Sequence, residues 1–208
     1  MLVFDFFSGT GSSTQAFKDA GHTVISFELD SSFEATENRD IMTLSVDYLL
    51  QTYGKPDFIW ASPPCQAFSV ASIGKHWTGG AGAYQPKTEL AVLNQMLVTK
   101  TRELIEGLNP RAFLIENPRG MLRKLPPVAG LERRTITYCQ YGDNRQKPTD
   151  LWGHVEGWTP KPACTRGAPC HEAAPRGSRT GTQGLKGSKE RSKVAPDLSL
   201  ELLQVLSR

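Results

Sequence analysis

The stretch Asp57-Phe58-Ile59-Trp60-Ala61-Ser62-Pro63-Pro64-Cys65-Gln66 decides the fold prediction. Its first five residues form an apolar run that predicts a buried strand, and the two prolines force the chain out of regular structure directly after it. The Cys65 thiol therefore emerges on a stiff turn at the carboxyl end of a strand, where open α/β sheets place their chemistry. A lone cysteine is more often a small hydrophobic residue in the core. A functional role for Cys65 is therefore predicted only if other polar residues accompany it.

A second apolar run supplies such support. Arg111-Ala112-Phe113-Leu114-Ile115 predicts another strand, and Glu116-Asn117-Pro118-Arg119-Gly120 follows it. Parallel strands of one sheet bring their carboxyl ends to the same edge. We therefore expect Cys65 and Glu116 to project from one edge of the sheet.

The first residues predict a nucleotide-binding unit. A strand at residues 2–6 runs into the glycine-rich turn Phe7-Ser8-Gly9-Thr10-Gly11-Ser12-Ser13 and then into a short helix that ends near Gly21. Such a turn brings backbone N–H groups close to a ligand. Glu28 follows the next strand, at residues 23–27, with the spacing at which doubly wound folds present an acid to a ribose.

The order of these elements predicts an α/β fold with a doubly wound, mostly parallel sheet. Helices are expected at residues 45–53 and 88–108, and the second carries an apolar stripe that we expect to pack in the core, formed by Leu90, Leu93, Leu97, Leu104 and Leu108. Two late strands, at residues 134–139 and 149–153, have no helix between them and are expected to pair antiparallel at one edge. We predict a main domain at residues 1–153, a short basic segment at 154–193 and a C-terminal helix at 194–208 that packs back on the main domain.

Taken in this order, the glycine-rich turn, the acid after the second strand and two later motifs resemble the DNA (cytosine-5) methyltransferase family. Asp5-Phe6-Phe7-Ser8-Gly9-Thr10-Gly11 looks like its first cofactor motif, Pro64-Cys65-Gln66 like its nucleophile motif and Glu116-Asn117 like its acid motif. The resemblance covers residues 1 to about 150. It implies the Rossmann-like fold of the S-adenosylmethionine-dependent methyltransferases, in a small form with a reduced target-recognition region.

The implied reaction explains why these residue types are present. Carbon 5 of cytosine is a poor nucleophile, and attack of a thiolate on carbon 6 turns the ring into a reactive enamine. A carboxyl group at ring nitrogen 3 supports that attack by neutralising the charge that builds in the ring. The resemblance makes Cys65 the nucleophile and Glu116 the acid, while Asn117 is expected to fix the loop.

The implied methyl donor is S-adenosylmethionine, bound across the carboxyl edge of the first strands. Glu28 matches the ribose-binding acid of the family, and Asp40-Ile41 matches its adenine contacts. Ser12 stands where the family usually has glycine, and it is small enough to cap the helix that follows. The complete set of expected cofactor residues is Phe7, Ser8, Gly9, Thr10, Gly11, Glu28, Leu29, Asp40, Ile41 and Pro64.

The basic motif of the family is altered in this chain. The family commonly carries an arginine-rich motif after a Tyr-Gly pair, whereas this chain has Tyr141-Gly142-Asp143-Asn144-Arg145-Gln146-Lys147-Pro148-Thr149-Asp150-Leu151-Trp152-Gly153. Either Arg145 or Lys147 is the cation that steadies the acid and the flipped base, or the segment is a solvated basic turn between two strands. The sequence leaves these alternatives open.

The nucleic acid substrate and the loop after Cys65 are also open. Ser62-Pro63-Pro64-Cys65-Gln66 is similar to the nucleophile motif of the family's tRNA-modifying branch, so RNA is the alternative to the expected double-stranded DNA. A catalytically weak DNA-binding relative is a further alternative, which the intact Cys65 and Glu116 oppose. The glycine-rich loop at residues 72–86 contains Lys75-His76-Trp77, and it is expected either to close over an extruded base or to be a plain surface loop.

Positive charge is concentrated near the C-terminus. Residues 161–193 hold eight Lys or Arg against two acids, while the net charge of the whole chain is +3. Such a segment is expected either to contact nucleic-acid phosphates or to be disordered. Within it, Cys164, Cys170 and His171 offer ligands that could join Cys139 in a zinc site, although reduced, unliganded cysteines are the default.

Composition indicates an ordinary globular chain. With 208 residues, of which 38% are hydrophobic, it can bury a normal core. The sequence has no run of eighteen apolar residues, and its first predicted strand begins at Leu2, which leaves no room for a signal peptide. We therefore expect a cytoplasmic, monomeric protein without membrane contact, whose four cysteines suit a reducing compartment.

Overall fold

The computed structural model describes residues 1–80, 83–165, 167–173 and 187–208. Its centre is a seven-stranded sheet in the order β3-β2-β1-β4-β7-β9-β8. The first five of these strands run parallel, and β9 and β8 continue the sheet antiparallel, which confirms the predicted α/β class. The strands are β1 (Leu2–Phe6), β2 (Thr23–Glu28), β3 (Glu37–Asn38), β4 (Phe58–Ala61), β7 (Ala112–Pro118), β8 (Arg133–Thr137) and β9 (Pro148–His154).

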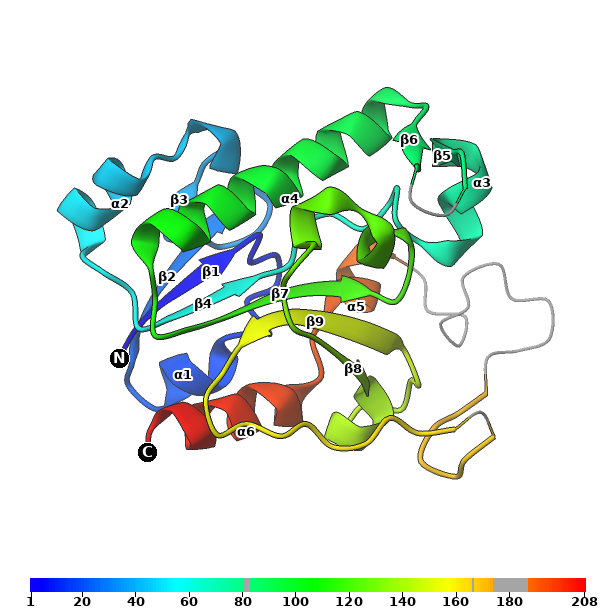
Figure 1. Cartoon of the computed structure of the whole chain (residues 1–208). Helices are drawn as coiled ribbons and strands as arrows, with labels where there is room; N and C mark the ends of the chain where they lie inside the picture. Colours follow the sequence, from blue (N-terminus) through cyan, green and yellow to red (C-terminus); the bar gives the residue numbers. More distant parts are fainter. Residues whose placement is uncertain (81–82, 166, 174–186) are drawn as a thin grey trace.

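Helices cover both faces of the sheet (Figure 1). On one face lie α1 (Gln15–Asp19) and α6 (Pro196–Leu206), and on the other lie α2 (Val46–Tyr53) and α4 (Glu89–Leu108). Near the carboxyl ends of the parallel strands lie α3 (Ile73–His76), α5 (Ser188–Ser192) and the small ribbon of β5 (Trp77–Thr78) and β6 (Gln85–Pro86). The 3-10 turns are η1 (Ile41–Thr43), η2 (Val70–Ser72), η3 (Met121–Lys124), η4 (Pro126–Val128) and η5 (Tyr138–Tyr141). Among the described helices, none has both the length and the apolar composition that a bilayer crossing requires.

Each face of the sheet buries its own set of apolar side chains. The layer beneath α2 and α4 includes Phe4, Phe27 and Ile59, all of them buried. The layer on the opposite face combines Phe17 of α1, Trp60 of β4 and three leucines of α6, Leu198, Leu202 and Leu206. The C-terminal helix α6 is therefore part of the main hydrophobic core and packs directly against α1.

β7 is longer than the sequence predicts, because it continues to Pro118. The pairing of β7 with β4 ends where Ile115 lies opposite Ala61. The pairing with β9 starts at Phe113 and continues to Pro118, so that Glu116 lies opposite Leu151. Glu116 therefore lies inside a strand rather than after one. The long antiparallel partner keeps its backbone regular past the end of β4.

The long predicted helix is present as α4, but its first half packs differently from the prediction. Leu90 and Leu93, expected in the core, are 38% and 48% exposed. Ala91 and Asn94 take the buried positions instead, and the buried face continues through Val98. The face that contains Ala91 and Asn94 has the same helical spacing as the face that contains the leucines. The hydrogen bond of Asn94 to the nucleophile turn, described below, explains why the first of these faces is buried.

The predicted basic segment at residues 154–193 is not uniform. Val155 and Trp158 are buried in the same layer as α6, so the first residues of this segment belong to the main core. Residue 166 and residues 174–186 lie outside the described residues. The sequence shows no periodicity after them, yet α5 forms at Ser188–Ser192. Hydrogen bonds from the main domain to the carbonyls of α5 and of the next residue account for this helix.

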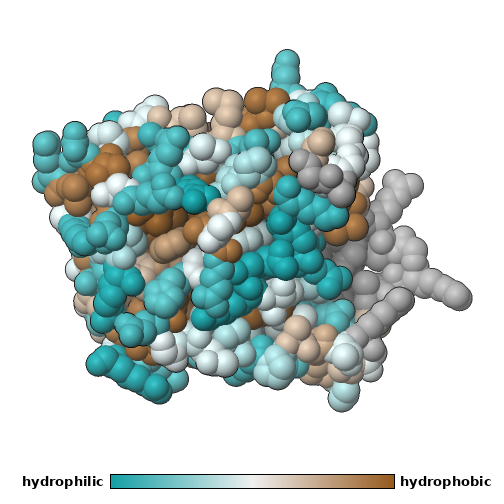
Figure 2. Space-filling model, in the orientation of Figure 1, coloured by the Kyte–Doolittle hydropathy of each residue, from teal (hydrophilic) through white to brown (hydrophobic). Residues whose placement is uncertain are grey.

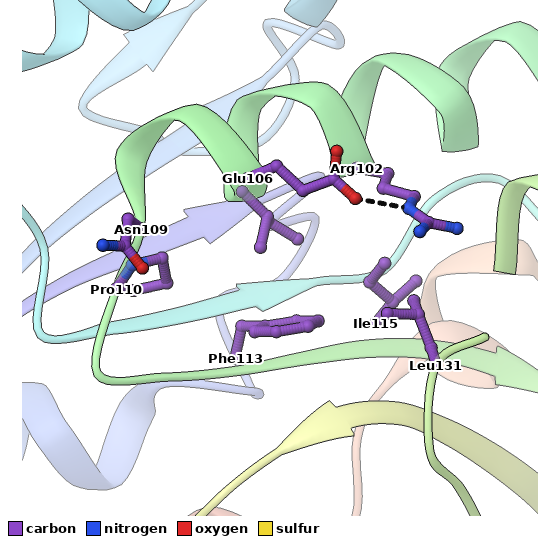
Figure 3. Close-up of a pocket in the computed structure, with 8 residues that line it drawn as sticks. Arg102, Glu106, Asn109, Pro110, Phe113, Ile115 and Leu131 are labelled. Atoms are coloured by element: carbon purple, nitrogen blue, oxygen red, sulfur yellow. Dashed lines mark hydrogen bonds and ion pairs between the residues drawn. The ribbon is translucent and has the colours of Figure 1, made fainter.

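A recess between α4 and β7 exposes apolar side chains (Figure 2). It contains a cavity of about 260 Å³ beside the ion pair of Arg102 and Glu106, whose closest atoms are 2.7 Å apart (Figure 3). Phe113 and Ile115 line it from the first half of β7. The cavity is formed by the C-terminal half of α4 and these β7 residues, and Cys65 and Glu116 do not line it.

Candidate active site

The turn that carries Cys65 is held by two buried asparagine side chains. The amide of Asn117 donates to the Pro63 carbonyl at 2.9 Å, and the amide of Asn94 donates to the Pro64 carbonyl at 3.1 Å. Proline lacks an N–H, so side chains contribute to fixing this turn where the backbone offers fewer donors. Sequence analysis missed Asn94, although a polar residue on the buried face of a long helix is a signal that could have found it.

Glu116 lies close to Cys65 and is buried. The Tyr138 hydroxyl donates to its Oε1 at 3.2 Å, and the Ser62 hydroxyl also forms a hydrogen bond with its carboxylate. Burial raises the pKa of Glu116 above its ordinary value, and the positive charge of Lys147 opposes this shift. A carboxyl group with a raised pKa keeps its proton to higher pH, which suits a group that donates a proton.

The Cys65 thiol interacts with charges of both signs. Burial raises the pKa of Cys65, and the carboxylate of Glu116 raises it further, while Lys147 and Arg191 lower it. The thiolate is the reactive form of cysteine, so these two cations favour reactivity. Arg191 belongs to α5, and sequence analysis did not place it near the nucleophile.

Lys147 is next to both the nucleophile and the acid. Its ammonium group lies 4.4 Å from the centre of the Tyr138 ring and donates to the Arg191 carbonyl at 3.2 Å. Burial lowers the pKa of Lys147, and the negative charges of Glu116 and Cys65 act against that shift. Its φ of 26° is unusual for a residue other than glycine, and such backbone strain clusters at functional sites.

Arg145 is engaged elsewhere. Its guanidinium forms an ion pair with Asp143, in which Nε donates to the two carboxylate oxygens at 2.8 and 2.9 Å. It also donates to the carbonyls of Glu190, Arg191 and Lys193, each at 3.4 Å. Arg145 therefore holds α5 against the main domain, and the geometry distinguishes it from Lys147.

A cavity of about 210 Å³ brings together six of the predicted cofactor residues, Phe7, Glu28, Leu29, Asp40, Ile41 and Pro64. The Glu28 carboxylate accepts the N–H of Gly9 at 2.9 Å and that of Asp30 at 3.0 Å, so it is fixed in place. Asp40 accepts the N–H of Met42 at 2.9 Å and begins the turn η1 that contains Ile41. A cavity with apolar walls and fixed carboxylates suits a nucleoside, whose base is flat and whose ribose offers hydroxyl donors.

The remaining predicted cofactor residues, Ser8, Gly9, Thr10 and Gly11, do not line this cavity. Gly9, Thr10 and Gly11 line a second cavity of about 690 Å³. A Cβ atom added at Gly9, whose φ is 48°, would meet nothing within 4 Å, so the backbone here is open to a ligand. Ser8 is buried, and its Oγ has no hydrogen-bond partner among the described residues. The open backbone and the free hydroxyl fit the polar end of a ligand such as S-adenosylmethionine.

Ser12 does not cap α1, contrary to the prediction. The N-cap position belongs to Thr14, and the Ser12 hydroxyl instead accepts the N–H of Val194 at 2.9 Å. Ser13 and Thr14 donate to the carboxylate of Asp5 at 2.8 and 2.7 Å, and burial raises the pKa of Asp5 to about 6. Ser12 therefore connects the glycine-rich turn to the C-terminal part of the chain.

Two residues of the glycine-rich loop at residues 72–86, His76 and Trp77, are buried. Trp77 donates from Nε1 to the Ala67 carbonyl at 2.7 Å, and its ring stacks on Phe68. His76 Nδ1 lies 2.7 Å from the hydroxyl of Thr88. Both side chains pack in the core beside the nucleophile turn, and closure of this loop over an extruded base stays a prediction. Lys75 is exposed, and residues 81–82 of the loop lie outside the described residues.

Comparison with known proteins points to one family. The family model for C-5 cytosine-specific DNA methylases matches residues 1–125. The chain is 29% identical to a Frog virus 3 (isolate Goorha) protein named "Probable DNA (cytosine-5)-methyltransferase", in an alignment over 220 residues that covers 99% of this chain and 100% of the viral protein. It is 30% identical over 130 residues to the type II methyltransferase M.AplI of Arthrospira platensis, covering 60% of this chain and 33% of M.AplI.

Solved structures share the fold. A chain described as a DNA modification methyltransferase encoded within an E. coli prophage matches with a TM-score of 0.52 at 19% identity, over 74% of this chain and 46% of that chain. The Entamoeba histolytica methyltransferase EhMeth matches with a TM-score of 0.52 at 14% identity, over 74% of this chain and 52% of that chain. The match covers about half of each of these two chains.

Proposed function

Because this chain belongs to the C-5 cytosine-specific DNA methylase family, we propose that it methylates carbon 5 of cytosine in double-stranded DNA through a covalent bond to Cys65. The observation that carries the proposal is the meeting of Cys65, Glu116 and Lys147 beside the cavity that Pro64 lines. The family and the fold imply that S-adenosylmethionine is the methyl donor.

The residues that would hold the donor line the two cavities described above. Glu28 offers its carboxylate to the ribose, Phe7 and Ile41 offer apolar contacts to the base, and Gly9 and Gly11 offer open backbone to the amino-acid end. When bound, S-adenosylmethionine supplies an electrophilic methyl group for carbon 5.

The sulfur of Cys65 starts the proposed reaction by forming a bond to carbon 6 of the cytosine ring. The electrons of the ring shift toward nitrogen 3, where the proton of Glu116 balances the charge, and carbon 5 becomes nucleophilic. Once carbon 5 carries the methyl group and S-adenosylhomocysteine has left, solvent water takes the carbon-5 proton, and the electrons of that C–H bond re-form the double bond between carbons 5 and 6. The bond between carbon 6 and sulfur breaks in that step, so Cys65 leaves as a thiolate and is regenerated. The proton on nitrogen 3 returns to Glu116.

Glu116 and Lys147 have complementary tasks in this scheme. Burial raises the pKa of Glu116, and the Tyr138 hydroxyl, which donates to its Oε1, orients the carboxyl group and opposes that rise. The ammonium of Lys147 favours the thiolate of Cys65, which burial otherwise disfavours. A single cation next to both groups therefore lowers the pKa of the nucleophile and limits the rise in the pKa of the acid.

Lys147→Gln is expected to slow alkylation of Cys65 by iodoacetamide several-fold at pH 7.5. Removal of the positive charge raises the pKa of the Cys65 thiol, so a smaller fraction is thiolate at that pH. Mass spectrometry of the peptide that contains Cys65 measures the rate across a pH series. Lys124→Gln is the matched control, because Lys124 also lies over a tyrosine ring but on an exposed turn. An unchanged pH midpoint in Lys147→Gln would contradict this role.

A trapping experiment tests the proposed function directly. In 5-fluorocytosine the carbon-5 proton is replaced by fluorine, so the final elimination fails and the enzyme stays attached to the base. We expect duplex DNA containing 5-fluorocytosine to form a denaturation-resistant complex in the presence of S-adenosylmethionine, and Cys65→Ala to form none. Trapping by a tRNA but not by the duplex would favour the RNA alternative. Failure of both substrates with a folded, cofactor-binding protein would favour a weak DNA-binding relative.

The positive charges near α5 are proposed to bind phosphates without reading the sequence of bases. Lys189→Ala with Lys193→Ala is expected to weaken binding equally for duplexes of different sequence. The slope of log K against log salt should fall by up to about 0.9 for each phosphate that the protein no longer neutralises. Fluorescence anisotropy without cofactor measures both effects, and Lys55→Ala, an exposed residue at the amino end of β4, is the control. A changed order of preferred sequences would instead make this segment a recognition element. Lys186, from the same basic run, lies outside the described residues.

A further inference from the structure

Four metal-ligating side chains converge beside the active site, outside the groups that the proposed reaction uses. Cys139 lies in η5, and Cys164, Cys170 and His171 come from the chain after β9. One ligand atom from each of these residues lies within 4.8 Å of all the others. Figure 1 shows this later segment passing alongside the turn that follows β8.

The distances between these atoms match a tetrahedral metal site. The Sγ atom of Cys139 lies 3.2 Å from that of Cys164 and 3.6 Å from that of Cys170. The Nδ1 atom of His171 lies 3.6 Å from both Cys164 Sγ and Cys170 Sγ. With zinc bonds of about 2.3 Å to sulfur and about 2.0 Å to nitrogen, a tetrahedron has edges of roughly 3.8 Å between sulfurs and roughly 3.5 Å between sulfur and nitrogen.

The surroundings of the sulfurs also suit thiolate ligands. The amide of Gln140 lies 3.3 Å from Cys170 Sγ, and the amide of Gln146 lies 3.3 Å from Cys164 Sγ. Each amide donates an N–H to a sulfur, and such outer contacts orient and stabilise thiolates that bind a metal. A disulfide would involve only two of the three cysteines and would not explain why the third cysteine and the imidazole lie beside them.

We propose that Cys139, Cys164, Cys170 and His171 bind one structural Zn²⁺ ion. Three thiolates and one imidazole in a closed tetrahedral set leave no position for substrate, which is typical of structural rather than catalytic zinc. A donor set rich in sulfur disfavours magnesium and calcium, which prefer oxygen.

The ion would join two parts of the chain next to the catalytic residues. Cys139 directly follows Tyr138, whose hydroxyl donates to Glu116, and Gln146 directly precedes Lys147. Zinc at this position would fix residues 161–165 and 167–173 against the wall of the site. This inference does not depend on the reaction proposed above.

Metal analysis of the wild-type protein is the first test. Protein produced with added zinc and purified without chelators is expected to contain about one zinc per chain by inductively coupled plasma mass spectrometry. Removal of zinc with a strong chelator should lower the melting temperature, and zinc but not magnesium should restore it. A folded wild-type protein that contains almost no zinc, or a disulfide between Cys139 and Cys164 in freshly purified protein, would overturn the proposal.

Variants then test the ligands. Cys164→Ser and Cys170→Ser are each expected to lose most of the bound zinc, whereas Cys65→Ser, which removes the remaining cysteine, should retain it. His171→Cys keeps a ligand at the fourth position and should retain the metal even if the serine variants fold poorly. Its cobalt-substituted form should show stronger sulfur-to-cobalt absorption than that of the wild type. Full zinc content in Cys164→Ser, or an unchanged cobalt spectrum in His171→Cys, would contradict the ligand set.

Discussion

Replacing Cys65 with serine is expected to abolish methyl transfer while leaving cofactor binding close to that of the wild type. A serine hydroxyl ionises far less readily than a thiol, and burial at this position already disfavours the charged form of cysteine. The acid and cation beside it, Glu116 and Lys147, offer no evident base for the hydroxyl proton. The side chain lies next to the cofactor cavity, which Pro64 lines but Cys65 does not.

Two measurements check this expectation. Transfer of a labelled methyl group to duplex DNA gives the turnover, and isothermal titration with S-adenosylmethionine gives the affinity for the cofactor. Ser207→Ala is the matched control, because Ser207 is exposed at the end of α6 and lines neither of the two cavities assigned to the cofactor. Turnover of Cys65→Ser within about tenfold of the wild type would show that another group attacks the base.

The second large effect is expected for Glu116→Gln, with a fall in kcat on the order of a hundredfold or more. Glutamine keeps the shape of the side chain and can still hydrogen-bond to Tyr138, but it cannot supply a proton to ring nitrogen 3. The raised pKa of Glu116, caused by burial, indicates a site that favours the protonated form. Removal of that proton should therefore affect the chemical step more than the binding of DNA.

Steady-state kinetics separate these effects. A fall in kcat with a similar KM supports proton donation, whereas a change confined to KM would make Glu116 a binding residue and would require another acid. Glu106→Gln is the matched control, since Glu106 lies on α4 in an ion pair with Arg102, at the cavity away from Cys65. We expect its turnover to equal that of the wild type.

The sequence did not predict which of Arg145 and Lys147 lies beside the nucleophile and the acid. Both residues are basic, they are two positions apart, and either matches the altered motif. Asp143 forms an ion pair with Arg145, and the carbonyls of α5 accept from it, so Lys147 is the one that interacts with Cys65 and Glu116. α5 lies more than forty residues after Arg145 and Lys147 in the sequence. No local sequence pattern predicts a contact over that separation.

The α4 leucines and Trp77 illustrate a related limit. Leu90 and Leu93 follow a helical period, as does the face that contains Ala91 and Asn94. Periodicity gives the helix but not which of two similar faces meets the sheet. Trp77 lies in a glycine-rich loop, yet its ring stacks on Phe68 in the core, a contact that depends on how the loop closes.

The sequence by itself determined the strands that carry Cys65 and Glu116, their parallel order and their common edge. These features are local or follow from general rules, because apolar runs give strands and the carboxyl ends of parallel strands meet at one edge. Only the tertiary structure decided that Lys147 adjoins both groups, that Asn94 and Tyr138 support them, and that Cys139 meets the cysteines after β9. Each of these contacts joins segments separated by tens of residues, and such pairings depend on the packing of the whole chain rather than on any pattern within one segment.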